Sequence, residues 1–131
     1  MHTARGTFEI KMTPDPPYET ADGVTLGIMR AEKRFVGELD GASTLTMTAA
    51  RTPTSGSAGY VAIERVSGTL SGKRGSFVLQ HSGTMNRGAA TLSCTVVPDS
   101  ATGELVGLSG SMRIDVDAGQ HKYTFDYEWN G

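Results

Sequence analysis

Two residues of this chain, Glu64 and His81, have side chains of the types that move protons between a protein and a bound molecule. They lie on either side of the tetrapeptide Ser71–Arg74, SGKR, in which Gly72 suits the first central position of a type II′ turn. Strands that pair symmetrically about Gly72 and Lys73 set Glu64 opposite His81. In such a pair the carboxylate orients the imidazole ring, which can accept or donate a proton near neutral pH. The spacing therefore predicts a general acid–base pair.

The same hairpin indicates which way the pair points. Symmetric pairing also sets Val66 opposite Leu79, on the more apolar of the two faces. We expect this face to lie inside the protein, with Tyr60 and Phe77 beside the pair, although a bulge at Gly75 would shift the register. Because a buried carboxylate needs a partner, two interpretations stay open. Either the pair is catalytic, or the two side chains only satisfy each other's hydrogen-bonding and charge requirements inside the protein.

The elements that position this pair are short strands. Glycine accounts for 17 of the 131 residues and separates runs rich in Thr, Val, Ile and aromatic residues, which is typical of antiparallel strands joined by tight turns. The proline-rich stretch 13–23 is expected to be a long loop. A helix over 24–35 is the alternative to a strand there, and Gly27 and the weak 3.6-residue periodicity favour the strand. The expected strands are 4–12, 24–39, 42–52, 59–71, 74–85, 88–97, 104–117 and 120–129.

Eight strands with short connections predict a single domain over residues 1–131. A sandwich and a closed barrel are both possible, but successive hairpins favour the barrel, whose closure removes exposed edges. We predict an eight-stranded antiparallel up-and-down β-barrel with an internal cavity. A barrel of this size can hold one small ligand.

The last hairpin has the clearest register. Pairing symmetric about the turn Ala118–Gly119 sets Met112 opposite Phe125 on one face and Asp115 opposite Lys122 on the other. A slip by one residue would mix the apolar and charged faces, so the register is well specified. Inward aromatic residues are either ligand contacts or core. The candidate ligand contacts from both hairpins are Tyr60, Phe77, His121, Tyr123, Phe125 and Tyr127.

Composition argues against several classes of partner. The net charge of −2 gives no reason to expect a nucleic acid or an anionic membrane, and no apolar run approaches the ~20 residues of a membrane span. The N-terminus lacks a secretory pattern, so we expect a cytoplasmic location. The single cysteine, Cys94, excludes an internal disulfide and is expected to be a buried, inert thiol. The histidines lack a short ligand spacing, and we expect neither metal nor cofactor.

Four segments together resemble the successive motifs of the domain of unknown function 3224 (DUF3224) family, over about residues 6–129. The resemblance implies a barrel of the calycin type, similar to that of plant allene oxide cyclase, and barrels of similar fold include cyclases and isomerases. The family itself is uncharacterised, so the resemblance implies no substrate. The segments are KRFVGELDGAS (33–43), GYVAIERVSGTLSGKRGSFVLQHSGTM (59–85), VVPDSATGELVGLSG (96–110) and HKYTFDYEW (121–129).

Three functions are open at this point. The first is a cofactor-independent isomerase or cyclase that acts on a small, largely apolar molecule, with His81 as proton acceptor or donor and Glu64 orienting it. The second is a non-catalytic carrier of a hydrophobic ligand. The third is a structural, oligomeric barrel filled by its own aromatic residues. Outward-facing Val61, Ile63 and Val78 make self-association plausible in each case.

Overall fold

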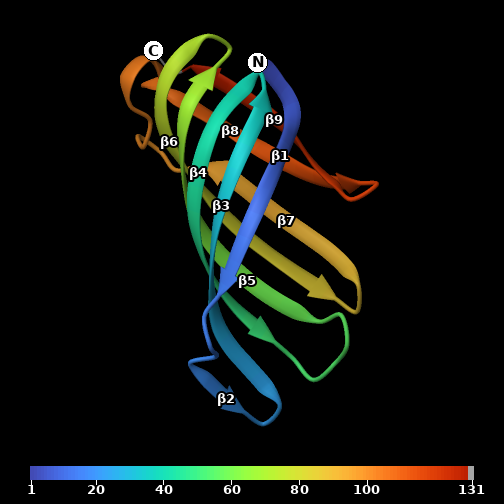
Figure 1. Ribbon diagram of the computed structural model, residues 1–131. Helices are drawn as coiled ribbons and strands as arrows, with labels where there is room; N and C mark the ends of the chain where they lie inside the picture. The colour runs from blue at the N-terminus through green and yellow to red at the C-terminus, as the bar shows by residue number, and fades with distance from the viewer. Residues whose placement is uncertain (130–131) are drawn as a thin grey trace.

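The chain forms a closed barrel in which the first strand pairs with both the third and the last (Figure 1). The structure is a computed structural model, and it describes residues 1–129. Eight antiparallel strands make the wall and a short ninth lies outside it, which confirms the predicted fold class. The elements are β1 (His2–Pro14), β2 (Glu19–Ala21), β3 (Val24–Gly37), β4 (Leu39–Arg51), β5 (Ala58–Leu70), β6 (Lys73–Asn86), β7 (Ala89–Val96), a 3₁₀-helix η1 (Gly103–Leu105), β8 (Leu108–Asp117) and β9 (Gln120–Trp129).

From β3 onward each strand of the wall pairs with its neighbour in the sequence, so the barrel is an up-and-down meander. The strands overlap over most of their length except at one seam, where the ladder between β7 and β8 is limited to the pair Thr95–Ser111. The start of β1 and the end of β9 lie at the end of the barrel that carries the β5–β6 hairpin (Figure 1). Within residues 1–129, no helix has the length and apolarity needed to cross a membrane.

Two expected boundaries were wrong. The stretch 13–23 is not a continuous loop, because Glu19–Ala21 forms β2 and pairs with the start of β3. The strand expected over 104–117 begins only at Leu108, because the preceding residues form η1. Gly103 and Gly107 both have positive φ, and these turns separate the helix from the strand.

The predicted register of the β5–β6 hairpin was wrong by two residues. Leu70 pairs with Lys73, so the turn residues are Ser71 and Gly72, and Glu64 lies opposite Leu79 instead of His81. Both turn residues have positive φ, which corresponds to a type I′ turn. A tertiary contact stabilises Ser71 in this conformation, since its N–H donates to the carbonyl of Glu38 in the neighbouring hairpin (2.8 Å). A shift of two residues leaves every side chain on its predicted face.

The register of the β8–β9 hairpin is confirmed. Met112 pairs with Phe125 on the inner face, and Asp115 pairs with Lys122 on the outer face. Three of the inward residues of β9, Tyr123, Phe125 and Tyr127, are buried as the alternation predicts.

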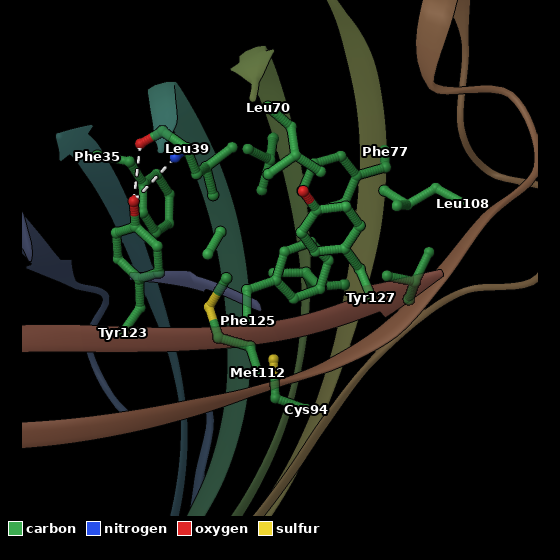
Figure 2. Packing of buried hydrophobic residues seen from close by; sticks show 14 of the residues in the cluster. Phe35, Leu39, Leu70, Phe77, Cys94, Leu108, Met112, Tyr123, Phe125 and Tyr127 are labelled. Carbon is green, nitrogen blue, oxygen red and sulfur yellow. Dashed lines mark hydrogen bonds between the residues drawn. The ribbon is translucent and has the colours of Figure 1, made fainter. Parts of the chain in front are cut away.

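The buried core fills one end of the barrel, the end with the β3–β4 and β5–β6 hairpins, which we call the closed end (Figure 2). The rings of Phe77 and Phe125 stack with centroids 5.7 Å apart, and Phe125 stacks on Tyr127 at 5.4 Å. The hydroxyl of Tyr123 accepts a hydrogen bond from the N–H of Leu39 (3.0 Å) and lies 3.0 Å from the carbonyl oxygen of the same residue. This hydroxyl ties β9 to the β3–β4 turn across the closed end. Gly6 leaves room for it, because a Cβ there would lie 2.5 Å from the Tyr123 oxygen.

The outer face of β5 carries two apolar side chains, Val61 and Ile63, that are both more than half exposed. Their outward position is as predicted. Val78 on β6 is only partly exposed, because Ser100 and Val97 of the β7–β8 connection bond to its backbone. Self-association through this face stays a prediction.

Replacing Tyr123 by Phe should lower the free energy of unfolding by about 1–3 kcal/mol, because the buried backbone groups of Leu39 lose their hydroxyl partner. Tyr127→Phe is the matched control. Its hydroxyl bonds to that of the exposed Ser71, which water can replace, so a loss below about 1 kcal/mol is expected. Urea unfolding of both variants measures the difference. Equal decreases in the free energy of unfolding would show that the Tyr123 hydroxyl does not stabilise the closed end.

Candidate functional site

A row of polar side chains crosses the inner wall halfway along the barrel. It comprises Lys33 on β3, Ser43 on β4, Glu64 on β5 and His81 on β6, all of them buried. Lys33 pairs directly with Ser43, whereas Ser43 to Glu64 and Glu64 to His81 are diagonal steps of two residues. Diagonal neighbours come together because barrel strands tilt and stagger. The row is therefore one level of the staggered barrel.

The carboxylate of Glu64 is the centre of the row. Its Oε1 lies 2.7 Å from Nε2 of His81 and 3.2 Å from Nζ of Lys33, and its Oε2 accepts a hydrogen bond from Oγ of Ser43 at 2.5 Å. The Glu64 side chain is fully buried. Burial by itself raises the pKa of this carboxyl, but the hydrogen bond from His81, the charge of Lys33 and the hydrogen bond from Ser43 outweigh it and lower the pKa below the ordinary 4.5. Glu64 is thus a buried carboxylate that stays ionised.

His81 has one nitrogen held and one nitrogen free. With Nε2 against the Glu64 carboxylate, the neutral ring carries its proton there and leaves the Nδ1 lone pair open. His81 Nδ1 makes no hydrogen bond to any of residues 1–129. Every fully buried side-chain nitrogen or oxygen among these residues does have a hydrogen-bond partner, so Nδ1 is not fully buried. This nitrogen is therefore accessible to solvent. A carboxylate-oriented imidazole with a free nitrogen is suited to general acid–base chemistry.

Lys33 is the second charged group at this level, and only 6% of its surface is exposed. Its ammonium lies 4.7 Å from the ring centroid of Phe8 and 5.8 Å from that of Phe35. Burial of an ammonium is tolerated here because Glu64 and two aromatic faces surround it. The positive charge is thus held inside the barrel at a fixed place.

Cys94 on β7 continues the row beyond His81, and its Sγ lies 3.6 Å from His81 Nε2. Burial, together with the nearby negative charge of Glu64, raises the pKa of the Cys94 thiol to about 12, although Lys33 acts in the opposite direction. The thiol therefore stays protonated and is not a nucleophile at neutral pH, in line with the predicted buried, inert cysteine. Within the described part of the chain, His, Cys, Asp and Glu side chains do not form a group of three able to hold a metal ion.

A pocket of about 290 Å³ occupies the opposite end of the barrel from the aromatic core, and we call this the open end. Lys33 and His81 of the row are among its lining residues, and the rest of the lining is mainly apolar. Tyr60 and His121 also line it, and the His121 ring packs 5.1 Å from that of Phe8. The apolar lining is Phe8, Ile10, Met12, Met29, Ala31, Leu45, Met47, Ala62 and Ile114.

The ring of Tyr60 depends on a glycine of the neighbouring strand. A Cβ at Gly83 would lie 2.6 Å from Cε1 and 2.8 Å from the hydroxyl oxygen of Tyr60, so the ring occupies the space of the missing side chain. Burial raises the pKa of Tyr60, which keeps the hydroxyl neutral as a hydrogen-bond donor. Gly83 therefore sets the position of one wall of the pocket.

The predicted site residues fall into two groups. Glu64 and His81 meet as predicted, although diagonally, and Tyr60 and His121 line the pocket together with His81. Four other candidates, Phe77, Tyr123, Phe125 and Tyr127, lie in the buried core toward the closed end and are not among the described residues that line the pocket.

Sequence reasoning missed Lys33 and Ser43. The alternation of side chains along a strand could have identified them. Lys33 lies on the same strand face as the apolar Ala31 and Phe35, and Ser43 lies on the same face as Leu45. The outward phase of β3 carries Glu32 and Arg34 instead.

Comparison with known proteins gives a clear relationship. The family model described as "Protein of unknown function (DUF3224)" matches residues 4–127. The chain belongs to the DUF3224 family. A solved structure of a DUF3224 protein of unknown function from Shewanella oneidensis MR-1 is 47% identical, with a TM-score of 0.95, and the similarity covers 100% of this chain and 99% of that one. No protein of curated description matches, and the similarity of this DUF3224 barrel to plant allene oxide cyclase stays a prediction.

Acid should destabilise this DUF3224 protein through Glu64. The pKa of Glu64 is lower in the folded chain than its ordinary value of 4.5, so the stabilisation is complete above pH 4.5 and is lost as the pH falls toward the folded pKa. This group alone should lower the free energy of unfolding by up to about 1.4 kcal/mol per pH unit in that window. Urea unfolding at several pH values measures this slope.

The double variant Lys33→Met/Glu64→Gln removes both charges together, so no unpaired ion stays buried. Its free energy of unfolding should depend less on pH below 4.5 than that of the wild type. Parallel pH profiles for the two proteins would argue against an ionised Glu64 in the folded DUF3224 chain.

Gly83→Ala should displace the Tyr60 ring from the pocket wall while the barrel still folds, since a side-chain rotation relieves the contact at a cost of about 1 kcal/mol or less. Gly59→Ala is the matched control, because the nearest atoms to its new methyl would be 3.9 Å away. Nitration of Tyr60 by tetranitromethane, followed by peptide mass spectrometry, should be faster in Gly83→Ala than in Gly59→Ala. Identical nitration rates would show that Gly83 does not position the ring.

Proposed function

We propose that the protein binds a small, largely apolar molecule in the open-end pocket and catalyses a cofactor-independent proton transfer on it, of the isomerase or cyclase type. The observation that carries this proposal is the 2.7 Å contact between Glu64 and His81 at the edge of an apolar pocket. His81 Nδ1 is the acid–base group, and Glu64 orients the ring and stabilises its protonated form.

The lining supports an apolar ligand. Met12, Met29 and Met47 surround the pocket, and methionine side chains adapt their shape to a bound molecule. Confinement holds a flexible ligand in a reactive shape, and the acid–base pair adds about 10²–10⁴-fold to the rate. The predicted similarity to plant allene oxide cyclase agrees with this reaction class, but only by analogy of fold.

A carrier of a hydrophobic ligand is the second candidate, and the adaptable methionine lining favours it equally. A carrier needs the pocket but has no use for a buried, charged row. The Glu64–His81 pair therefore favours the enzyme. The two functions are distinguished by removing the His81 side chain, which should abolish turnover of an enzyme while ligand binding is kept.

Ligand capture can be tested with N-phenyl-1-naphthylamine, an uncharged probe whose fluorescence rises in apolar surroundings. We expect saturable, one-to-one binding to the wild type. Met47→Trp fills the pocket from β4 and should abolish the binding, whereas Thr46→Trp, which points outward from the same strand, should not.

Thermal unfolding checks that both tryptophan variants keep the fold. A wild-type protein that shows no saturable binding, or a Met47→Trp variant that binds as well as the wild type, would refute the pocket as a ligand site.

A further inference from the structure

We propose that the substrate is an apolar ketone or aldehyde with an acidic C–H next to its carbonyl group, and that Lys33 holds the carbonyl oxygen while His81 removes the proton. This inference rests on the function proposed above and adds to it the class of substrate and a role for Lys33.

Glu64 itself is not free to act as the base. Its Oε1 faces both His81 and Lys33, and its Oε2 is bonded to Ser43, so three donors surround the carboxylate. A carboxylate engaged in this way is a weak proton acceptor, as its lowered pKa also indicates. Glu64 therefore serves to hold two other groups, and those two groups line the pocket.

Those two groups complement each other chemically. Lys33 carries three N–H donors and a full positive charge, and Glu64 Oε1 is the acceptor that it contacts among the described residues. His81 Nδ1 is an open lone pair. A cationic donor and a neutral base, held on either side of one carboxylate oxygen, match a carbonyl oxygen and the adjacent C–H of one small molecule.

The proton transfer is balanced within the site. The C–H bond breaks and its proton goes to His81 Nδ1, the bonding pair forms a carbon–carbon double bond, and the carbonyl π pair moves onto the oxygen. The resulting enolate faces Lys33, and the imidazolium faces Glu64, so each new charge lies beside an opposite charge already in place. Return of the proton to a different carbon completes an isomerisation, and no oxidant or cofactor is consumed.

The rest of the pocket determines which substrate groups fit beside the carbonyl. The remaining lining is mainly aliphatic side chains, methionines and aromatic rings, with Tyr60 and His121 as additional polar groups. An apolar ring or chain of modest size, with a single carbonyl, satisfies both the lining and the two polar groups.

Binding is tested first with 2-naphthol, which imitates an aromatic enol, and with naphthalene, which has the same body without the oxygen. Isothermal titration should show 2-naphthol bound about tenfold or more tightly than naphthalene, because a hydrogen bond to a charged donor is gained. Lys33→Met should remove this preference and leave naphthalene affinity unchanged.

Chemistry is tested with 2-tetralone in D₂O, by following exchange of its α-protons by NMR. The wild type should accelerate exchange by about 10²–10⁴-fold over buffer. His81→Asn should return the rate to that of buffer, and Lys33→Met should lower it by about 10²-fold. If Lys33→Met does not fold, Lys33→Met/Glu64→Gln tests the same loss of oxygen recognition without an unpaired buried carboxylate.

The outcomes separate the two proposals. Equal affinity for 2-naphthol and naphthalene, with no exchange above buffer, would overturn the carbonyl substrate and leave an apolar binding pocket. Binding of neither compound, together with failure of the N-phenyl-1-naphthylamine titration, would overturn the pocket function itself. Exchange that needs His81 but is unchanged in Lys33→Met would overturn the role of Lys33 alone.

Discussion

The burial of the Glu64 carboxylate inside the barrel requires a polar or charged partner on each neighbouring strand. Glu64 has no access to water, so the wall must supply its entire solvation, and it does so from three other strands through Lys33, Ser43 and His81. The carboxylate therefore links β3, β4, β5 and β6 at a single level and fixes the orientation of the two groups that face the pocket.

This level separates two regions of different character. Toward the closed end the interior is a cluster of buried side chains that includes stacked aromatic rings, and there the Tyr123 hydroxyl bonds to the backbone of Leu39 (Figure 2). Toward the open end the inward residues of the same strands, such as Met29 and Met47, are only partly buried and surround a pocket. The same alternation of inward and outward residues thus builds a core at one end and a pocket at the other.

Alternation along the strands was enough to predict which side chains face inward, including Glu64 and His81, but not how the strands are offset. The turn of the β5–β6 hairpin was misplaced because Gly72 was taken as the first turn residue, whereas it is the second, after a Ser71 held by a contact with Glu38 of another hairpin. That contact is tertiary and invisible in the local sequence. The inward position of Lys33 was not predicted, for a different reason. Lysine is rarely buried, and only the carboxylate that accepts it makes its burial tolerable.

The division of the barrel has a consequence for how such proteins diversify. Because the tightly packed rings at one end carry most of the apolar burial, the residues around the mouth are under weaker packing constraints. Exchanges among them would reshape the chamber at little thermodynamic penalty, while the charged level beneath stays intact. The shape of the pocket mouth can thus vary between related barrels while the row of Lys33, Ser43, Glu64 and His81 below it is kept.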